Sequence, residues 1–291
     1  FKLSLPLLHR LMMGVVYGDA LMQVVYRVRP YEKQPGSTEA LYRAWVERCR
    51  ESVFDGGFRQ FGANIRKLVR DFDRLEIVDV VKPRVGLVGE ILVKFHPVAN
   101  NDLARIIERE GGEAVVPSLM DFLQYCAYDY DFNRKYMSMG YLEALAGNAL
   151  IRYMEFYRKG LRKALRKSER FLEPQTIDEL AFGAAPIMTR GNQNGEGWFL
   201  TGEMVELIHQ GAENIVCMQP FGCLPNHITG KGSIKALKDL YPQANIAAID
   251  YDPGASEVNQ LNRIKLMFSA AFRKLEQPGA DTNAAHGLVA E

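Results

Sequence analysis

The stretch VGLVGEILVKF, residues 85–95, decides the fold class of this chain. It is a continuous apolar run with β-branched residues, and it ends in a loop of sequence HPVANN. A strand that is buried on both faces of a parallel sheet has this pattern. Asn100 or Asn101 then caps a predicted helix, and EAVVPS, residues 113–118, is a second short strand. The order strand, helix, strand predicts a βαβ unit with a right-handed crossover.

Two further buried strands are predicted downstream, in NIVCMQ at residues 214–219 and NIAAID at residues 245–250. Each follows a helical pattern and is separated from the next element by turn residues. A last helix is expected over residues 256–275. Together these elements predict an α/β fold with a doubly wound, mostly parallel, Rossmann-like sheet of about four strands.

The helical parts of the sequence lie outside this strand pattern. Residues 1–81 have apolar side chains at helical spacing, and we interpret them as a helical segment, a linker or a remnant of an upstream lobe. The Rossmann-like domain is expected to span residues 82–277, with an inserted helical layer at residues 119–171, and residues 278–291 form a tail. Because the first residues already have the pattern of an interior helix, we expect the chain to belong to a longer protein.

Composition and charge exclude several classes of protein. Of 291 residues, 47% are hydrophobic and 24% are charged, which excludes an intrinsically disordered or fibrous chain. A net charge of +1 provides no overall basic field for nucleic acid or an anionic membrane. The longest uncharged run, residues 214–230, contains two prolines and is shorter than the roughly 20 apolar residues that a membrane span needs. With only four cysteines, we expect a cytoplasmic protein with reduced thiols.

One predicted helix, YRKGLRKALRKSERF at residues 157–171, is strongly basic. Its cations fall into rows at i, i+4 spacing, which places them on common faces of the helix. They are Arg158, Lys159, Arg162, Lys163, Arg166, Lys167 and Arg170. Two interpretations stay open: a solvated helix face, or a docking surface for an acidic partner.

The loop after the third predicted strand, PFGCLPNHITGKG at residues 220–232, carries the most informative chemistry. Ligands of an open parallel sheet bind outside the carboxyl ends of its strands. Cys217 lies near the end of the strand, Cys223 lies in the loop, and His227 follows four residues later. Thiolates presented in this way suit iron–sulfur or zinc ligation, although Cys217 is equally compatible with packing in the core.

Five residues are candidates for binding a cofactor. Lys231, Gly232 and Ser233 belong to a GKGS turn that opens a predicted helix, where free N–H groups and the lysine suit a phosphate or a carboxylate. The turn lacks the spacing of a nucleotide-hydrolysing P-loop. Asn100 and Asn101, in the loop after the first strand, are further candidates at the same edge of the sheet.

Glu90 and His96 flank the carboxyl end of the first predicted strand and are weak candidates for catalysis. They are one titratable pair without a visible third member. The sequence has no nucleophile elbow, zinc-binding H-E-x-x-H helix or kinase signature, so hydrolase and kinase functions lack their usual support.

Residues 86–118, GLVGEILVKFHPVANNDLARIIEREGGEAVVPS, and residues 195–266, from GEGWFLTGEM through CLPNHITGKG to NRIKL, resemble a known family. They are similar to the C-terminal part of the large acyl-CoA dehydratase activase-related proteins, of the 2-hydroxyacyl-CoA dehydratase and benzoyl-CoA reductase superfamily. The helical stretch at residues 1–32 also resembles the segment that precedes this domain. The resemblance covers most of the chain, and its most specific motifs are CLPNHITGKG and GEGWFLTGEM.

The resemblance implies an iron–sulfur electron-transfer system, in which an ATP-hydrolysing activator passes low-potential electrons to a cluster that reduces a thioester. It implies a [4Fe–4S] cluster and a CoA thioester as ligands. The implied partners are an upstream lobe, ATPase modules and a separate dehydratase or reductase component. Cys223, followed by Leu224 and Pro225, resembles the Cys-x-Pro of the late cluster ligand, with Cys217 as the alternative.

The sequence also departs from that family. Its earlier cysteine ligands and the ATPase motifs of the activator have no counterpart in this chain, and a [4Fe–4S] cluster needs about four thiolates. We therefore expect the chain alone to hold no intact cluster and to be inactive. The alternatives are a non-catalytic scaffold that docks ATPase and dehydratase modules through the basic helix around Arg162, and a small zinc module that uses Cys217, Cys223 and His227.

Overall fold

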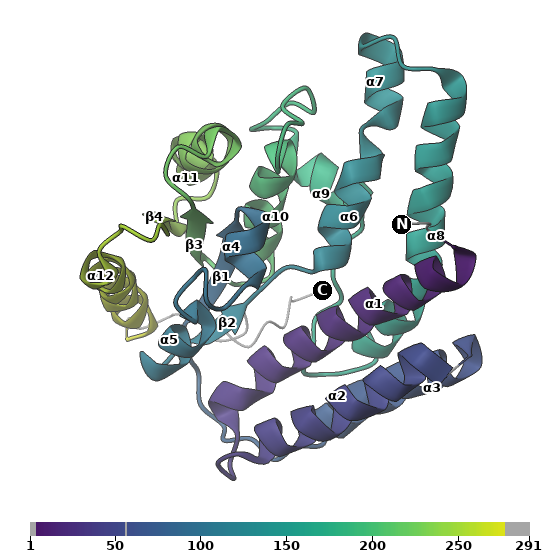
Figure 1. Cartoon of the computed structure of the whole chain (residues 1–291). Helices are drawn as coiled ribbons and strands as arrows, with labels where there is room; N and C mark the ends of the chain where they lie inside the picture. The colour runs from purple at the N-terminus through teal and green to yellow at the C-terminus, as the bar shows by residue number, and fades with distance from the viewer. Residues whose placement is uncertain (1–3, 56, 277–291) are drawn as a thin grey trace. The chain divides into compact units, whose positions relative to one another are not determined.

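The computed structural model describes residues 4–55 and 57–276, which fold as two compact units (Figure 1). The helical unit combines the chain up to Val80 with Ser118–Pro174. The sheet unit combines Val81–Pro117 with the chain from Gln175 onward. The two helical segments that the sequence pattern separates therefore belong to one compact unit.

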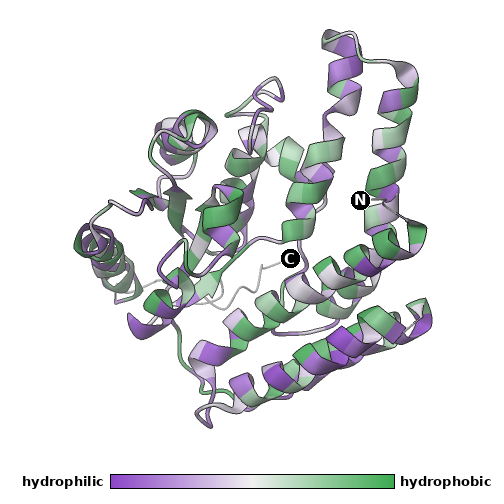
Figure 2. Cartoon of the chain, viewed as in Figure 1, coloured by the Kyte–Doolittle hydropathy of each residue, from purple (hydrophilic) through white to green (hydrophobic). Residues whose placement is uncertain are grey.

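The helical unit consists of six α-helices and one 3₁₀ turn within the described residues. They are α1 (Leu5–Val28), η1 (Arg29–Tyr31), α2 (Ser37–Asp55), α3 (Phe58–Asp73), α6 (Leu119–Tyr128), α7 (Tyr130–Tyr136) and α8 (Tyr141–Leu165). Ser4 caps α1 by accepting a hydrogen bond from the Leu7 N–H. Figure 2 shows hydrophobic residues alternating with hydrophilic ones along α2 and α3, as expected of helices with one buried face.

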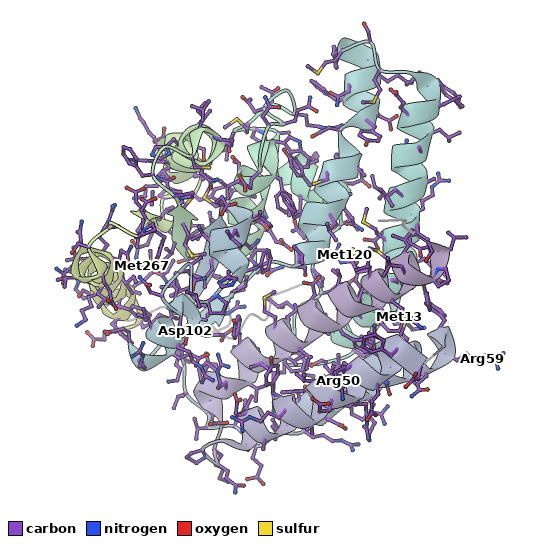
Figure 3. The ribbon with its side chains drawn as sticks, viewed as in Figure 1. Met13, Arg50, Arg59, Asp102, Met120 and Met267 are labelled. Carbon is purple, nitrogen blue, oxygen red and sulfur yellow. The ribbon has the colours of Figure 1, made fainter. Side chains whose placement is uncertain are left out.

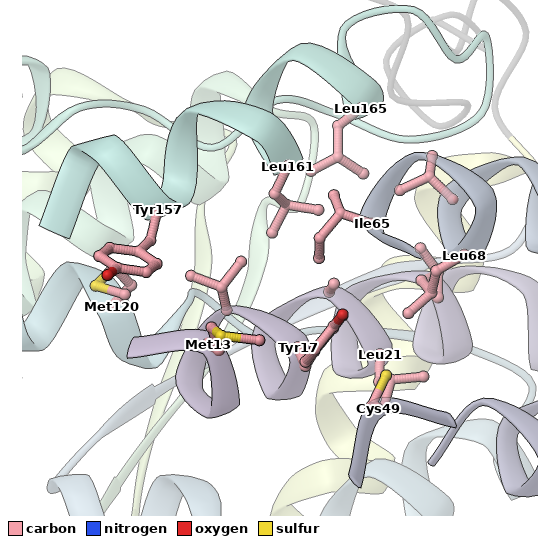
Figure 4. Packing of buried hydrophobic residues seen from close by; sticks show 14 of the residues in the cluster. Met13, Tyr17, Leu21, Cys49, Ile65, Leu68, Met120, Tyr157, Leu161 and Leu165 are labelled. Atoms are coloured by element: carbon pink, nitrogen blue, oxygen red, sulfur yellow. The ribbon is translucent and has the colours of Figure 1, made fainter. Parts of the chain in front are cut away.

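The core of the helical unit surrounds α1, with contributions from α2, α3, α6 and α8. Met13 is fully buried, and Met120 of α6 is 1% exposed. Figure 4 shows Leu161 of α8 facing Ile65 of α3 in the same cluster. Burial of such side chains contributes about 1.5–3 kcal/mol each, so this shared core stabilises both segments of the unit.

The sheet unit contains four parallel strands in the order β2-β1-β3-β4. The strands are β1 (Arg84–Gly89), β2 (Glu113–Val115), β3 (Asn214–Gln219) and β4 (Asn245–Asp250). The helices and turns are α4 (Ile91–Phe95), α5 (Leu103–Arg109), α9 (Ile177–Ala184), α10 (Gly197–His209), η2 (Asn226–Gly230), η3 (Lys231–Ser233), α11 (Ile234–Leu240) and α12 (Glu257–Leu275). This architecture confirms the predicted α/β, Rossmann-like fold.

Different helices pack on the two faces of the sheet. Val88 of β1 and Cys217 of β3 are register partners, and both belong to a buried cluster with residues of α10 and α11. Gly86 lies so close to α10 that a Cβ there would come within 2.5 Å of Leu207. Helix α12 packs on β3 and β4 with side chains outside that cluster, among them Met267 (Figure 3). Asp102, also labelled in Figure 3, precedes α5.

The first predicted strand is too long, because residues 85–95 do not form one extended segment. Strand β1 ends at Gly89, and the next residues form the short helix α4. Gly89 has a φ of +140°, and a Cβ there would lie 1.9 Å from the Met218 carbonyl oxygen. The turn therefore requires glycine. A short apolar run does not distinguish a buried strand from a buried helix, which explains the error.

Among the described residues, no helix is both long enough and apolar enough to cross a membrane.

Candidate functional site at the carboxyl edge of the sheet

The carboxyl ends of the parallel strands meet at one edge of the sheet, and the connection after β3 lies there. We call residues 220–230 of this connection the Cys223 loop. Its start is fixed by the Phe221 N–H, which donates to both carboxylate oxygens of Asp252 at 2.9 Å. Its end is fixed by Thr229, whose carbonyl oxygen accepts a hydrogen bond from the Thr201 hydroxyl of α10 at 2.9 Å. The loop is thus held at both ends.

Glu196 connects the Cys223 loop to the start of α4. One of its carboxylate oxygens accepts a hydrogen bond from the Ile91 N–H at 3.1 Å, and the other accepts one from Asn226 Nδ2 at 2.8 Å. The preceding Gly195 has a φ of +64°, and a Cβ there would lie 2.6 Å from the ring of Pro225. Glycine therefore lets the GNQNGEG loop approach closely enough for Glu196 to reach its partners.

The environment of Glu196 raises the pKa of its carboxyl group. Glu196 is 6% exposed, and burial raises the pKa of its carboxyl group above the ordinary value. The nearby charge of Glu90 raises it further, while hydrogen bonds from Ile91 and Asn226 act in the opposite direction. Burial dominates, so this carboxyl takes up a proton more readily than an exposed glutamate.

Cys223 is the accessible thiol at this edge. It is partly exposed, and its Sγ accepts a hydrogen bond from Asn226 Nδ2 at 3.2 Å. The amide of Asn226 is buried and is directed to both Glu196 and Cys223. Phe221 and Leu224, on either side of the cysteine, are 82% and 67% exposed. Cys223 is therefore open to solvent in part, and the nearby Phe221 and Leu224 side chains provide exposed apolar surface.

Cys217 is less suited to bind a metal than Cys223, because of its burial and its raised pKa. It is fully buried against α10, and a Cβ added to Gly230 would lie 2.8 Å from its Sγ. Burial raises the pKa of its thiol to about 12, and the charges of Glu203 and Glu196 add to this effect. Of the two cysteines considered as metal ligands, Cys223 is partly exposed at the carboxyl edge of the sheet and Cys217 is buried. Burial works against Cys217 as a ligand, because the thiolate is the form that binds metal.

His227 has both ring nitrogens engaged. Its Nδ1 lies 2.9 Å from the Cys223 carbonyl oxygen, which only accepts, so Nδ1 carries the proton. Its Nε2 then accepts from Gln219 Nε2 at 3.3 Å, and that amide also donates to Asp250 at 2.8 Å. In the described part of the chain, no group of three or more His, Cys, Asp or Glu residues is placed to hold a metal ion.

The structure separates the two weak catalytic candidates. Glu90 lies at the start of α4, where its carboxylate accepts a hydrogen bond from the Val93 N–H at 2.9 Å as a helix cap. His96 lies at the other end of α4 and is exposed. Glu90 therefore has a structural role in the short helix that the sequence pattern missed.

The asparagines predicted to bind a cofactor hold the loop after α4. Asn100 is buried, donates to the Val93 carbonyl at 2.7 Å and accepts from the Leu103 N–H at 3.1 Å. Asn101 donates to the side chain of Gln260 on α12 at 2.9 Å. These contacts connect α4, α5 and α12 and explain both side chains without a ligand.

The predicted anion site at the GKGS turn is not an open helix N-terminus. Lys231, Gly232 and Ser233 form the 3₁₀ turn η3, and the Lys231 N–H donates back to carbonyl groups of η2. The Ser233 hydroxyl lies 2.8 Å from the Thr229 carbonyl oxygen. Helix α11, which follows, has only seven residues. The Lys231 N–H and the Ser233 hydroxyl are therefore used by the preceding turn, whereas the Lys231 side chain is exposed.

A buried ion pair below this edge was not found from the sequence. Lys94 of α4 and Glu203 of α10 are 2.5 Å apart, and each side chain is 1% exposed. Lys94 lies inside an apolar run of the sequence, and this could have indicated the pair, because a buried cation requires a partner. Glu196 and Asn226 were also missed as functional residues, although both lie in the quoted motifs GEGWFLTGEM and CLPNHITGKG.

Comparisons of this chain with family models, with curated proteins and with solved structures found no match. The functional proposal therefore depends on the geometry of the carboxyl edge and on the resemblance of the motifs that build it.

Proposed function

We propose that this chain is an iron–sulfur-associated domain of an acyl-CoA dehydratase activase-related protein, with a part in ATP-driven low-potential electron transfer to a CoA thioester or to a dehydratase partner. The supporting observation is the position of Cys223. It is partly exposed at the carboxyl edge of a Rossmann-like sheet, in the CLPNHITGKG motif that carries the resemblance. Ligands of such sheets bind at this edge.

The donor set of this chain fits one ligand position of a [4Fe–4S] cluster, not a complete cluster. A cluster of this type is held by about four thiolates. Cys223 provides one accessible sulfur, whereas Cys217 is buried in the neutral form that its raised pKa favours. The proposal therefore assigns the remaining ligands to other parts of the intact protein, such as an upstream lobe.

The residues around Cys223 support such a role by positioning and tuning its sulfur. The Asn226 amide donates to Sγ, and hydrogen bonds to ligand sulfurs are among the factors that set the reduction potential of a cluster. Glu196 in turn fixes the orientation of that amide. The exposed Phe221 and Leu224 provide apolar surface that a covering lobe would exclude from water. A bound cluster would supply the one-electron chemistry.

The test compares two cysteine variants in the intact protein that contains this chain, purified without oxygen. We expect Cys223→Ala to lose most of the iron, the sulfide and the visible charge-transfer absorbance. Cys217→Ala is the matched control, since it removes a thiol from the same segment, and we expect it to retain them. Equal losses in both variants, or an unsubstituted protein without iron, would contradict the proposal.

A second measurement uses the chain alone. Because one accessible thiolate does not hold a cluster, we expect no stoichiometric iron and sulfide after anaerobic purification. Finding a full cluster in the isolated chain would show that the ligand assignment is wrong.

The two alternatives have weaker support. The zinc module requires a free nitrogen on His227, but both ring nitrogens are engaged by Cys223 and Gln219. The docking scaffold is centred on Arg162, but Arg162 lies 2.8 Å from Glu173, and Arg158 on the same helix lies 2.5 Å from Asp121. Zinc binding without iron, or loss of partner binding with unchanged iron content in an Arg162→Glu variant, would favour these alternatives instead.

A further inference from the structure

The outer faces of α3 and α8 enclose a groove with a volume of about 300 Å³ in the helical unit. The two helices pack directly on each other through Ile65 and Leu161, and the groove lies along the solvent side of that contact. Its walls are formed by positions spaced i, i+3, i+4 and i+7 on each helix. They are Arg66, Val69, Arg70 and Asp73 from α3, and Gly160, Lys163, Ala164, Lys167 and Ser168 from α8 and its end.

Four cationic side chains surround this groove, two from each wall. Arg66 and Arg70 are one turn apart on α3, and Lys163 and Lys167 are one turn apart on the other wall. All four are exposed. Within the described part of the chain, none of them lies within 4 Å of a carboxylate oxygen.

The cations on the adjacent row of α8 behave differently. Arg158 lies 2.5 Å from Asp121, and Arg162 and Arg166 both bind Glu173. The basic run of this helix is therefore divided by the fold into a row that is neutralised by carboxylates and a row that borders the hollow without such partners.

The one carboxylate in the groove is already engaged. Asp73 accepts a hydrogen bond from the Ser168 hydroxyl at 2.8 Å, and its charge also acts on Arg170. The groove has open space at Gly160, because a Cβ added there would meet no atom within 4 Å. Val69 and Ala164 contribute apolar lining. The result is a small hollow with positive walls.

We propose that this groove binds the phosphate groups of a small ligand that carries two or more of them. Arginine forks match phosphate oxygens in a bidentate manner, and lysine contributes a point charge. Two cations on each wall suit a diphosphate between them, and the volume is that of a small-molecule site. This inference goes beyond the proposed function, because it concerns the helical unit and does not require Cys223.

The first test measures binding to the full chain by calorimetry at low salt, with pyrophosphate, ATP and adenosine as probes. We expect saturable binding of pyrophosphate or ATP and none of adenosine. Comparable binding of the two would indicate recognition of phosphate alone, and tighter binding of ATP would indicate a nucleotide; both support the proposal. No saturable binding of either probe, or equal binding of adenosine, would overturn it.

Charge-removing variants locate the site. We expect Arg66→Ala/Arg70→Ala to weaken binding at least about tenfold, because each lost charge-assisted hydrogen bond to phosphate accounts for a factor of this order. The control is Lys67→Ala/Lys159→Ala, which removes the same number of exposed charges from positions outside the groove, one on α3 and one on α8. The control should change affinity less than twofold. Equal weakening in both pairs would indicate unspecific attraction and overturn the site.

A steric variant leaves all charges in place. Gly160→Leu adds a bulky side chain to the lining of the groove, whereas Gly160→Ala adds only a methyl group into open space. Both replace a glycine inside a helix, so neither should lower the melting temperature. We expect Gly160→Leu to abolish binding and Gly160→Ala to retain it. If Gly160→Leu binds ATP as well as the unsubstituted chain, or if an acidic peptide binds both equally, the surface is not a phosphate pocket.

Discussion

The helical unit and the sheet unit both bury ion pairs, but they bring the partners together in different ways. In the sheet unit, Lys94 and Glu203 belong to helices that flank the parallel strands, and the polar groups of the site converge where those strands end. In the helical unit, Arg158 of α8 and Asp121 of α6 meet without any repeating topology that requires it. In the sheet unit, strand order brings the polar groups together. In the helical unit, the pairing of individual side chains does so.

Polar contacts in the helical unit also join segments that are far apart in the sequence. Asp19 of α1 accepts hydrogen bonds from the backbone of Leu119 at 2.8 Å and of Met120 at 3.0 Å. A side chain near the N-terminus therefore caps a helix of the second segment. The difference between the units indicates where substitutions will have the largest effect on stability, which the following predictions address in decreasing order.

The largest effect is expected for Arg158→Met. The guanidinium contacts Asp121 at 2.5 Å, Gln124 at 3.1 Å and Glu155 at 3.3 Å, so its loss breaks a buried ion pair and two further contacts. We expect the free energy of unfolding of the helical unit to fall by about 3–5 kcal/mol. Urea unfolding measures the loss, and hydrogen exchange of peptides from α6 and α8 assigns it to this unit.

The matched control is Lys159→Met, at the next and exposed position of the same helix. Its effect should stay within about 0.5 kcal/mol. A loss below about 1 kcal/mol for Arg158→Met would show that the buried network is dispensable, and the contrast between the two units would then be weaker than we infer.

The second effect is a pH dependence that originates at Asp19. Burial raises the pKa of this carboxyl from the ordinary value of 3.8 to about 6, despite the two backbone hydrogen bonds and the charge of Arg158. Between pH 4 and 6 the folded state holds a proton that the unfolded state has lost. Stability is therefore highest below the unfolded pKa and falls as the pH rises through 6, by roughly 3 kcal/mol.

An Asp19→Asn variant isolates this contribution. The amide does not titrate, so the difference in unfolding free energy between the variant and the unsubstituted chain should change between pH 4.5 and pH 7. Denaturant titrations at both pH values provide the measurement. An unchanged difference would mean that Asp19 does not titrate in this window.

The sequence pattern predicts the sheet unit better than the helical unit, because the order of parallel strands fixes where their loops lie. Four parallel strands place their connecting loops at one edge, so the position of Cys223 at that edge follows from strand order alone. The same pattern gives no information about which side chains bridge the loops. Glu196 reaches Ile91 and Asn226 only because of backbone turns at Gly89 and Gly195, which periodicity does not reveal.

The sequence of the basic helix indicates its charged faces but not the partners of individual cations. Spacing at i, i+4 correctly indicates that cations share faces of the helix, but it does not tell which face is neutralised. Arg158 and Arg162 find carboxylates on α6, on α8 and near Pro174, whereas Lys163 and Lys167 border the groove. Such pairings depend on tertiary packing, and a helix face looks the same in sequence whether or not a carboxylate lies opposite it.

The smallest expected effect concerns Asn226 in the sheet unit. Asn226→Ala removes the donor to buried Glu196 and to the sulfur of Cys223, and we expect a loss of about 1–2 kcal/mol in unfolding free energy. The hydrogen bond from Asn226 holds the sulfur of Cys223 in one orientation, so we expect the rate of Cys223 alkylation at neutral pH to change by a factor of a few in the variant. The exposed Cys126 serves as an internal reference in the same sample.

The same alkylation experiment separates the two cysteines of the β3 segment. In the folded chain Cys217 should stay unlabelled, because it is buried and its thiol has a pKa of about 12. Mass spectrometry of the peptides reports each site. If Asn226→Ala leaves the rate at Cys223 unchanged while stability falls, the amide serves only to hold the Glu196 carboxylate. If Cys217 reacts as fast as Cys223, the strand end opens in solution, and the carboxyl edge offers two thiols to a ligand instead of one.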